Sequence, residues 1–323
     1  MQESKLENTI QESKFTNWQK YAAPIFLVAL ILFNTIFTSN FLRINTVNNV
    51  ITQSAVTILV SMGMTLVIST GGIDISVGSL MALTGVITAS LMGEIGLFGS
   101  IAIGVAASLA LGVINGFLVG KMRLQAMVVT LGMMLTARGL AQVVTNGRDI
   151  YFNQLGQAGS TLSAFGSYRI GGIVPVQIIP IIIAVLVVWL IVEKMTLGRK
   201  IEATGDNLTA SKMTGINANL IMIVVYVLSA MFAGFAGILE MSRVSVASGG
   251  ALGQLAELDA IAAVAIGGTP LSGGKANVFG TVIGAIIMQL ITLTAVMNNV
   301  PEEYAQIMKA VILILAVYIQ RKK

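Results

Sequence analysis

The stretch INTVNNVITQSAVTILVSMGMTLVISTGGIDISVGS, residues 44–79, decides the fold class. Its first 27 residues, 44–70, carry no charged side chain. A helix needs about 20 apolar residues to cross a bilayer core of about 30 Å, so this run is long enough to span a membrane. The run ends at a pair of glycines, and Asp74 follows between two isoleucines. We therefore predict a membrane-spanning helix that ends in an irregular turn.

Similar apolar runs follow one another along the chain. Hydrophobic residues make up 55% of the sequence and charged residues only 10%, against about 25% charged residues in soluble domains. These runs predict an all-α polytopic membrane protein with about ten transmembrane helices. The predicted spans are residues 21–42, 44–70, 75–93, 95–120, 124–147, 170–192, 213–239, 260–274, 276–301 and 304–320. The 260–274 run is too short to cross the core. We therefore expect short or broken helices around residues 70–79 and 260–275.

The distribution of basic residues predicts the orientation. If the N-terminus is cytoplasmic and the spans alternate, thirteen Lys and Arg residues lie in cytoplasmic segments and four in external ones. The positive-inside rule then favours N-in, C-in. Residues 1–20 and 321–323 are predicted as cytoplasmic tails, and residues 21–320 as one transmembrane domain. No aromatic-rich basic patch is present, so the net charge of +5 indicates topology and no nucleic-acid partner.

The composition excludes several kinds of catalytic site. The chain has no cysteine and no histidine, which removes thiolate nucleophiles, imidazole bases and the common zinc ligands. It also lacks the GxxxxGK[ST] loop that binds nucleotide phosphates. We expect no catalytic residue, no bound cofactor and no metal site in this chain.

Polar side chains inside predicted spans are expensive in lipid and are therefore candidates for function. Asp74 could cap the helix that begins near Ile75, or it could hold a turn that opens as a gate. Arg138 requires a partner, a wet cavity or an interface. Glu257 and Asp259 could cap the short 260–274 helix. The candidates for a gate or translocation path are Asp74, Ser76, Ser79, Arg138, Gln142, Glu257, Asp259 and Ser272.

A weak internal repeat links the two predicted breaks. Residues 67–87 can be aligned with residues 263–283, which places Gly71 over Gly267 and Ser76 over Ser272. Transporters are often built from such repeats, with interrupted helices near the substrate path. Two glycine-rich turns can also resemble each other by chance, so the residues alone leave both interpretations open.

The longest and most charged predicted cytoplasmic connection is EKMTLGRKIEATGDNLTASKMT, residues 193–214. It contains helix-forming residues and a break at residues 205–207. The loop could simply be solvated and carry the basic residues of the inner side. It could also form a short helix on which a cytoplasmic partner docks.

Four motifs together resemble the permease subunits of ribose-type ABC sugar importers. They are GGIDISVGSLMALTG (71–85), TLGRKIEATGDNLTASKMTGIN (196–217), ELDAIAAVAIGGTPLSGG (257–274) and YAQIMKAVILILAVYIQRKK (304–323). The resemblance covers nearly the whole chain from about residue 20. Residues 137–153 look closer to galactofuranose permeases, whereas residues 257–275 are equally ribose-like. The resemblance therefore implies a pentose or furanose sugar.

The resemblance also implies partners and a location. Expected partners are a second permease subunit, identical or different, a cytoplasmic ATPase with two fused nucleotide-binding domains that uses the ATP, and an extracytoplasmic sugar-binding protein, all at a bacterial plasma (inner) membrane. Residues 194–215 would form the ATPase-coupling loop. Its expected contact residues are Glu202, Thr204, Gly205, Asp206, Asn207, Ala210, Met213 and Gly215. Asp206 departs from the family pattern, which leaves the details of docking open.

The residues leave one alternative from another class of transporter. An ion-coupled secondary transporter would work without an ATPase, but it would need an ion-coordinating or titratable group in its core. Asp74 and Asp259 are the candidates for that group. The charged inner loop and the four motifs favour the importer.

Overall fold

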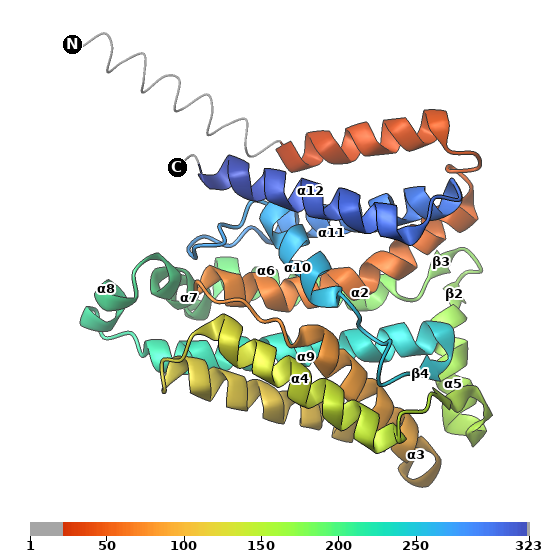
Figure 1. The fold of residues 1–323 in the computed structure, drawn as a ribbon, viewed down its shortest axis with the longest axis horizontal. Helices are drawn as coiled ribbons and strands as arrows, with labels where there is room; N and C mark the ends of the chain where they lie inside the picture. Colours follow the sequence, from red (N-terminus) through yellow and green to blue (C-terminus); the bar gives the residue numbers. More distant parts are fainter. Residues whose placement is uncertain (1–21, 322–323) are drawn as a thin grey trace.

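The computed structural model describes residues 22–321 and is built almost entirely of helices (Figure 1). Its first helix is Ala22–Phe37. The other α-helices are α2 (Ile44–Ser69), α3 (Val77–Gly120), α4 (Ala126–Thr145), α5 (Gly156–Ser167), α6 (Ile178–Trp189), α7 (Thr196–Asp206), α8 (Leu208–Met213), α9 (Ala218–Val244), α10 (Ala256–Ile266), α11 (Val278–Met297) and α12 (Glu302–Arg321). The predicted tails lie outside the described residues, except for Arg321 at the end of α12.

Within residues 22–321, the non-α elements between the helices are short. Strand β1 (Ile150–Tyr151) pairs antiparallel with β4 (Val246–Ala247), and β2 (Arg169–Ile170) pairs antiparallel with β3 (Val174–Pro175). A 3-10 turn, η1, spans Phe152–Gln154, and a π-helical turn, η2, spans Leu190–Lys194. The predicted all-α fold class is confirmed.

Helix α3 contains two of the predicted spans. Gly96 has φ 76° and ψ 176°, a conformation open only to glycine, and it breaks the helix there. The Thr84 hydroxyl donates to the Gly104 carbonyl at 3.3 Å, and the Thr88 hydroxyl donates to the Ser100 carbonyl at 3.4 Å. The two halves therefore lie antiparallel and correspond to the predicted spans 75–93 and 95–120.

The number of ten transmembrane helices is not confirmed. Within residues 22–321, five helices are long and apolar enough to cross a membrane: α2, α3, α4, α9 and α11. A sixth is obtained if Ile178–Lys194 and Thr196–Asp206 are counted together, although they meet at 74°. The helix α10 has only 11 residues, about 16 Å at 1.5 Å per residue, so the predicted short helix is present.

Several spans begin or end at residues other than the predicted ones, and three of these shifts have a structural cause. Helix α6 starts at Ile178 rather than at residue 170, because the β2–β3 hairpin occupies residues 169–175. Helix α9 starts at Ala218 because the Asn217 side chain accepts the backbone N–H of Leu220 and caps it. The short helix ends at Ile266 and not at residue 274, since Gly267 and Gly268 terminate it.

Close backbone contacts hold the helices of the core together. Helix α9 packs along α2 and α3, and α11 packs on α2 and α10. A Cβ on Gly116 of α3 would lie 2.5 Å from the Cα of Ile223 on α9. A Cβ on Gly284 of α11 would overlap the Ala263 carbonyl of α10. Gly112, Gly116 and Gly120 of α3 recur at four-residue spacing and all face α9 closely, which allows the close helix approach typical of membrane proteins.

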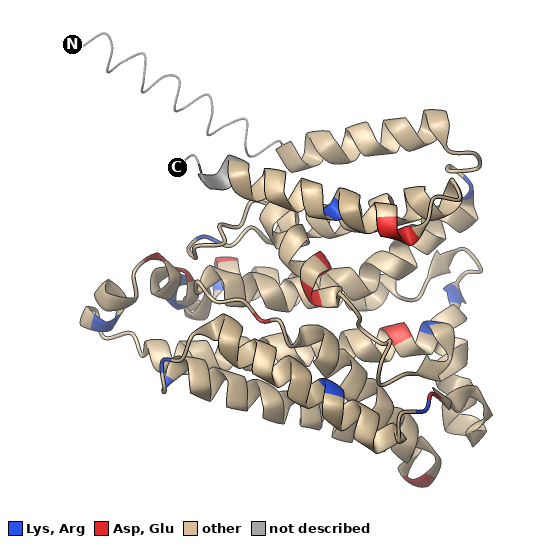
Figure 2. Cartoon of the chain, viewed as in Figure 1, with Lys and Arg blue, Asp and Glu red and all other residues tan. Residues whose placement is uncertain are grey.

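Many charged residues lie at the two ends of the helix bundle (Figure 2). Helices α7 and α8 mark one end, on the left in Figure 1, and α5 with the β2–β3 hairpin marks the other end. Segments predicted as cytoplasmic lie at the α7–α8 end, and we call this the inner end. Which end faces the cytoplasm stays a prediction from the basic residues. A few charged residues on α4, α10 and α12 lie between the ends.

Candidate functional site

A buried hydrogen-bond network surrounds Asp74 in the loop between α2 and α3. Asp74 is fully buried. Its Oδ1 accepts the backbone N–H of Ser76 at 3.0 Å and the Ser76 hydroxyl at 2.6 Å, and its Oδ2 accepts the hydroxyl of Ser229 from α9 at 2.8 Å. The Asn115 side chain, near the end of α3, donates to the Ser76 hydroxyl at 3.0 Å. The network ties the loop to α9 and to the second half of α3, both of which are distant from it in sequence.

The predicted capping role of Asp74 needs a correction. Helix α3 starts at Val77, so Ser76 occupies its N-cap position and Asp74 lies two residues earlier. Asp74 still accepts a backbone N–H, that of Ser76, but it organises the loop rather than the first helical turn. Neither Ser229 nor Asn115 could be predicted as a member of this network, because they lie 155 and 39 residues from their partners in sequence.

Two neighbours of this network are buried without a hydrogen-bond partner in the described part of the chain. They are the Ser79 hydroxyl and the Tyr226 hydroxyl. A Cβ on Gly72 would lie 2.7 Å from the Tyr226 hydroxyl, so this group faces the loop. An unpaired buried hydroxyl costs free energy, so these two groups reduce the stability of this region.

A second irregular segment meets the start of α3. Residues 248–255 join β4 to α10, and Gly253 (φ 66°) lies directly against Gly78. A Cβ on Gly78 would overlap the Gly253 carbonyl and would lie 2.6 Å from Oε2 of Glu257. The predicted candidate Glu257 is thereby brought next to the 71–79 motif. Two helices, α3 and α10, begin where these irregular segments meet.

Arg138 of α4 holds the 248–255 segment in place. Its Nη1 donates to the carbonyls of Gly249 at 3.2 Å, Gly250 at 3.3 Å and Leu252 at 2.7 Å. Glu240 of α9 accepts the backbone N–H of Gly253 at 3.2 Å from the other side. The partner expected for Arg138 is therefore backbone. Glu240 was missed because it directly follows the predicted span 213–239 and resembled a loop residue.

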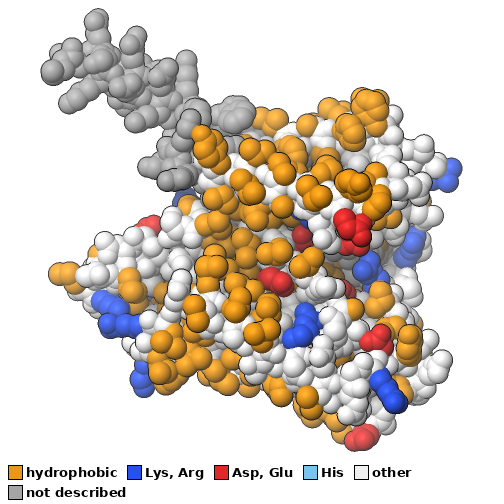
Figure 3. Space-filling view, viewed as in Figure 1, with side chains coloured by type: hydrophobic (Ala, Val, Ile, Leu, Met, Phe, Trp, Pro, Cys, Tyr) orange, Lys and Arg blue, Asp and Glu red, His pale blue; other side chains and the backbone are white. Residues whose placement is uncertain are grey.

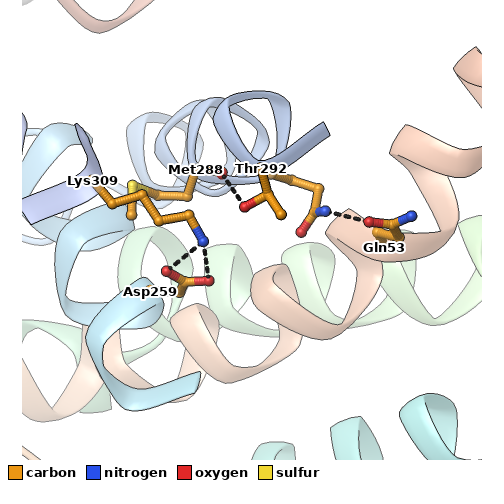
Figure 4. Close-up of polar contacts among 6 residues, drawn as sticks. Gln53, Asp259, Met288, Thr292 and Lys309 are labelled. Atoms are coloured by element: carbon orange, nitrogen blue, oxygen red, sulfur yellow. Dashed lines mark hydrogen bonds and ion pairs between the residues drawn. The ribbon is translucent and has the colours of Figure 1, made fainter. Parts of the chain in front are cut away.

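Asp259 forms an ion pair with Lys309 of α12 instead of capping its own helix. Lys309 Nζ lies 3.0 Å from Oδ1 and 2.9 Å from Oδ2 of Asp259 (Figure 4). The same view shows Gln53 of α2, which accepts a hydrogen bond from Gln289 of α11. Through this ion pair Lys309 joins α12 to α10.

The inner end brings both predicted breaks into contact with α7. Gly274 donates its backbone N–H to the Ser69 carbonyl at the end of α2, at 3.0 Å. A Cβ on Gly205 of α7 would overlap that same carbonyl. The Glu202 carboxylate accepts the backbone N–H of Ala276 at 3.0 Å. Partial burial raises the pKa of Glu202, and this hydrogen bond opposes the rise.

The residues of the predicted coupling loop form a short helical hairpin. Thr204 is buried, Glu202 and Gly205 are half-buried, and Asp206, Asn207, Ala210, Met213 and Gly215 are exposed. The Asn207 side chain accepts the backbone N–H of Ala210 at 2.9 Å and caps α8. Met213 is 85% exposed at the tip of the hairpin. A helix was thus expected here, and two are present.

The structure separates the predicted gate residues into groups. Asp74, Ser76 and Ser79 belong to the buried loop and the start of α3, and Arg138 and Glu257 lie beside it. Gln142 is exposed one turn after Arg138. Ser272 is exposed at the inner end, where its carbonyl approaches Gly71. Among the described residues, no group of three or more Asp and Glu side chains could hold a metal ion.

The alignment of the two breaks is shifted from the one predicted. Gly71 (φ 80°) follows the last turn of α2, and Gly268 (φ 88°) is its counterpart after α10. The sequence alignment had placed Gly267 opposite Gly71. The second loop, residues 267–277, is also longer than the first, residues 70–76. Both breaks nevertheless have the same order of elements, namely a helix, a turn that contains a glycine, and a new helix.

Comparison with known proteins gives the family. The family model described as "Branched-chain amino acid transport system / permease component" matches residues 46–317. The chain belongs to this family of transport permeases, which confirms the resemblance found in its motifs. No solved structure matches the chain.

Curated relatives in this family are named for sugars. The chain is 42% identical over 306 residues to the ribose import permease protein RbsC of Escherichia coli (strain K12), covering 93% of this chain and 92% of that protein. It is 36% identical to the galactofuranose transporter permease protein YtfT of the same strain, covering 85% and 79%. The D-allose transport system permease protein AlsC, also from that strain, is 34% identical and covers 94% and 92%.

Proposed function

We propose that this chain is the permease subunit of an ATP-driven ABC importer for a monosaccharide. The observation that carries this is the similarity, over more than nine-tenths of the chain, to a permease named for ribose import. The galactofuranose and allose relatives support a neutral sugar in general. Identity over the chain is higher to the ribose relative than to the galactofuranose relative, which favours ribose among the predicted pentoses and furanoses.

The inner end supports a cytoplasmic ATPase as the source of energy. Helices α7 and α8 project beyond the bundle in Figure 1 and carry an exposed methionine, Met213, at their tip. Leu208 of α8 is exposed as well, so this helix offers more than one apolar side chain on which another protein could pack. The inner face of α7 touches Ser69, Gly274 and Ala276. A partner that moves α7 would therefore also move the two loops at residues 70–76 and 267–277. ATP hydrolysis is assigned to that partner.

Two further partners follow from the importer proposal. An extracytoplasmic protein that binds the sugar would deliver it at the outer end, beside α5 and the β2–β3 hairpin. A second permease subunit would complete the path through the bacterial inner membrane. The names of the relatives lend no support to the ion-coupled alternative.

Purification from native membranes tests this proposal. The full chain should bring down an ATPase with two nucleotide-binding domains, and a sugar-loaded delivery protein should raise ATP hydrolysis in lipid discs. The sugar that stimulates identifies the substrate. Purification of the chain without an ATPase, together with sugar movement coupled to a proton or sodium gradient, would contradict the proposal.

A further inference from the structure

An exposed stretch of irregular backbone lies at membrane depth beside α4. Arg138 is the thirteenth of the 20 residues of α4, which places it about 18 Å from the inner end of that helix and about 10 Å from its outer end. Arg138 binds the carbonyls of residues 249, 250 and 252, so the 248–255 segment lies at a similar depth. Gly250, Ala251 and Gln254 of this segment are nevertheless exposed.

Lipid cannot cover this part of the surface. Irregular backbone at membrane depth is tolerated only where protein buries it or where it lines a water-filled cavity. The neighbouring side chains give the same answer, because the amides of Gln142 and Gln254 are exposed and Glu257 is only half-buried. Figure 3 shows acidic and basic side chains in the middle of this face, between hydrophobic areas. Charged groups in that position require water or another protein.

The guanidinium of Arg138 retains donors for a further ligand. Its three hydrogen bonds all come from Nη1, whereas an arginine carries five N–H donors. Within residues 22–321, none of the hydrogen bonds of Arg138 comes from Nη2. Arg138 is half-buried. Two carboxyl groups, those of Glu257 and Glu240, act on it electrostatically. The surface therefore carries both ionisable and uncharged polar groups.

We propose that residues 250–254, with Arg138, Gln142 and Glu257, form the wet wall of the sugar path and contact the hydroxyl groups of the sugar. This inference rests on the proposed function and adds the place of the path. Glutamine amides both donate and accept hydrogen bonds, Arg138 donates and Glu257 accepts, a combination that suits a neutral polyol. The 71–79 motif lies directly behind this wall through the Gly78–Gly253 contact. The second permease subunit closes the opposite side.

Single cysteines can test this wall because the sequence contains none. Ala251→Cys and Gln254→Cys would be placed in the full chain in lipid discs and exposed to a charged methanethiosulfonate reagent. Leu186→Cys is the matched control. Leu186 is 49% exposed at the centre of the helical segment Ile178–Lys194, about 12 Å from the outer end of that segment. Reaction requires a thiolate in water, so a thiol in lipid stays unreactive.

The wet wall predicts that both test cysteines label roughly tenfold or more faster than Leu186→Cys. An excess of ribose, allose or fructose, tested separately, should slow labelling of Gln254→Cys. Labelling of both test cysteines as slow as that of Leu186→Cys would overturn the wall. Fast labelling that none of the sugars slows would overturn the sugar contact.

This experiment separates the inference from the proposed function. Labelling needs no ATPase and no delivery protein, whereas the importer proposal depends on both. Slow labelling in a preparation that imports sugar with ATP would contradict the proposed wall and leave the importer proposal standing. Fast, sugar-sensitive labelling in a chain that transports without an ATPase would contradict the importer proposal and leave the proposed wall standing. Ala251→Cys adds only a sulfur to an exposed methyl group, so it serves if Gln254→Cys folds poorly.

Discussion

Asp74 shows how a single charged residue can be accommodated in a chain rich in apolar residues. Its carboxylate is fully buried but accepts three hydrogen bonds, from two groups of Ser76 and from Ser229. Buried polar groups are tolerated when they are paired in this way. The glycines at positions 71 and 72 give the loop the irregular path that this pairing needs. Asp74 thus fixes the entry to α3.

Removing the carboxylate should weaken both folding and transport. Asp74→Ala leaves one backbone N–H and two hydroxyls without an acceptor, which we expect to cost about 3 kcal/mol. Asp74→Asn retains one oxygen and should cost less. We expect the unfolding temperature of the purified chain to fall from wild type to Asp74→Asn and further to Asp74→Ala, and thermal unfolding measures this order.

The exposed outer residue Asp149 supplies the control, because Asp149→Asn should leave unfolding unchanged. If Asp74→Ala and Asp74→Asn both transported sugar at the wild-type rate, the gate role predicted for Asp74 would be wrong.

At the scale of elements, the ion pair between α10 and α12 is open to a double-mutant cycle. Lys309→Met removes the cation that faces Asp259 and should destabilise the chain by about 3 kcal/mol. Adding Asp259→Asn removes the unpaired charge and should restore most of that loss. The four unfolding temperatures give the coupling. A double variant as unstable as the sum of the single variants would show that the two helices are not joined by this pair.

Weakening the contact between α7 and the end of α2 should reduce sugar transport without abolishing ATP hydrolysis. Gly205→Ala places a methyl group against the Ser69 carbonyl and should push α7 away from both loops. We expect sugar uptake to fall roughly tenfold while the ATPase still binds and hydrolyses ATP. Uptake and hydrolysis should be measured on the same vesicles.

Gly132→Ala is the matched substitution, because a Cβ at Gly132 meets no atom within 4 Å. Equal uptake by the Gly205→Ala and Gly132→Ala variants would mean that the Gly205 contact does not couple α7 to sugar transport.

The tip of α8 offers a separate test of docking. Met213→Asp places a charge on the exposed apolar tip without touching the helix bundle. We expect affinity for the ATPase to fall by about tenfold or more with the unfolding temperature unchanged. Co-purification at graded salt concentrations measures the loss. Undiminished recovery of the ATPase would move its docking surface away from α8.

Most helices could be predicted from the sequence, because long uncharged runs have few other structures available in a membrane. The turn at Gly96 was placed to within a few residues, since Glu94 interrupts the apolar run. Helix starts at α6 and α9 were missed. They depend on a hairpin and on an asparagine cap that leave apolar residues outside the helix.

For the site, the sequence predicted candidate residues but not the groups that they contact. Intramembrane charge identified Asp74, Arg138 and Asp259, but not what they bind. Ser229, the partner of Asp74 on another helix, lies 155 residues away in sequence, and the partner of Asp259 lies 50 residues away. The partners of Arg138 are carbonyls, which every residue carries. Only the fold reveals these pairings, because helix packing decides which distant groups meet.

At the scale of the whole molecule, the described helices form one bundle with irregular segments at its centre and a helical hairpin at its inner end (Figure 1). The loop 70–76 connects these regions, since it begins beside α7 and ends beside the 248–255 segment. Transporters with interrupted helices place their substrate path at such points. A movement at α7 could therefore reach the proposed sugar path within one short stretch of chain.

Uptake into sealed vesicles tests the central claim most directly. The full chain would be reconstituted with its co-purified ATPase, with ATP enclosed on the side of α7 and α8 and radiolabelled ribose with the delivery protein on the other side. The account predicts uptake against a gradient that stops when ATP, the ATPase or the delivery protein is omitted. Concentrative uptake by the chain alone, driven by an ion gradient, would contradict it.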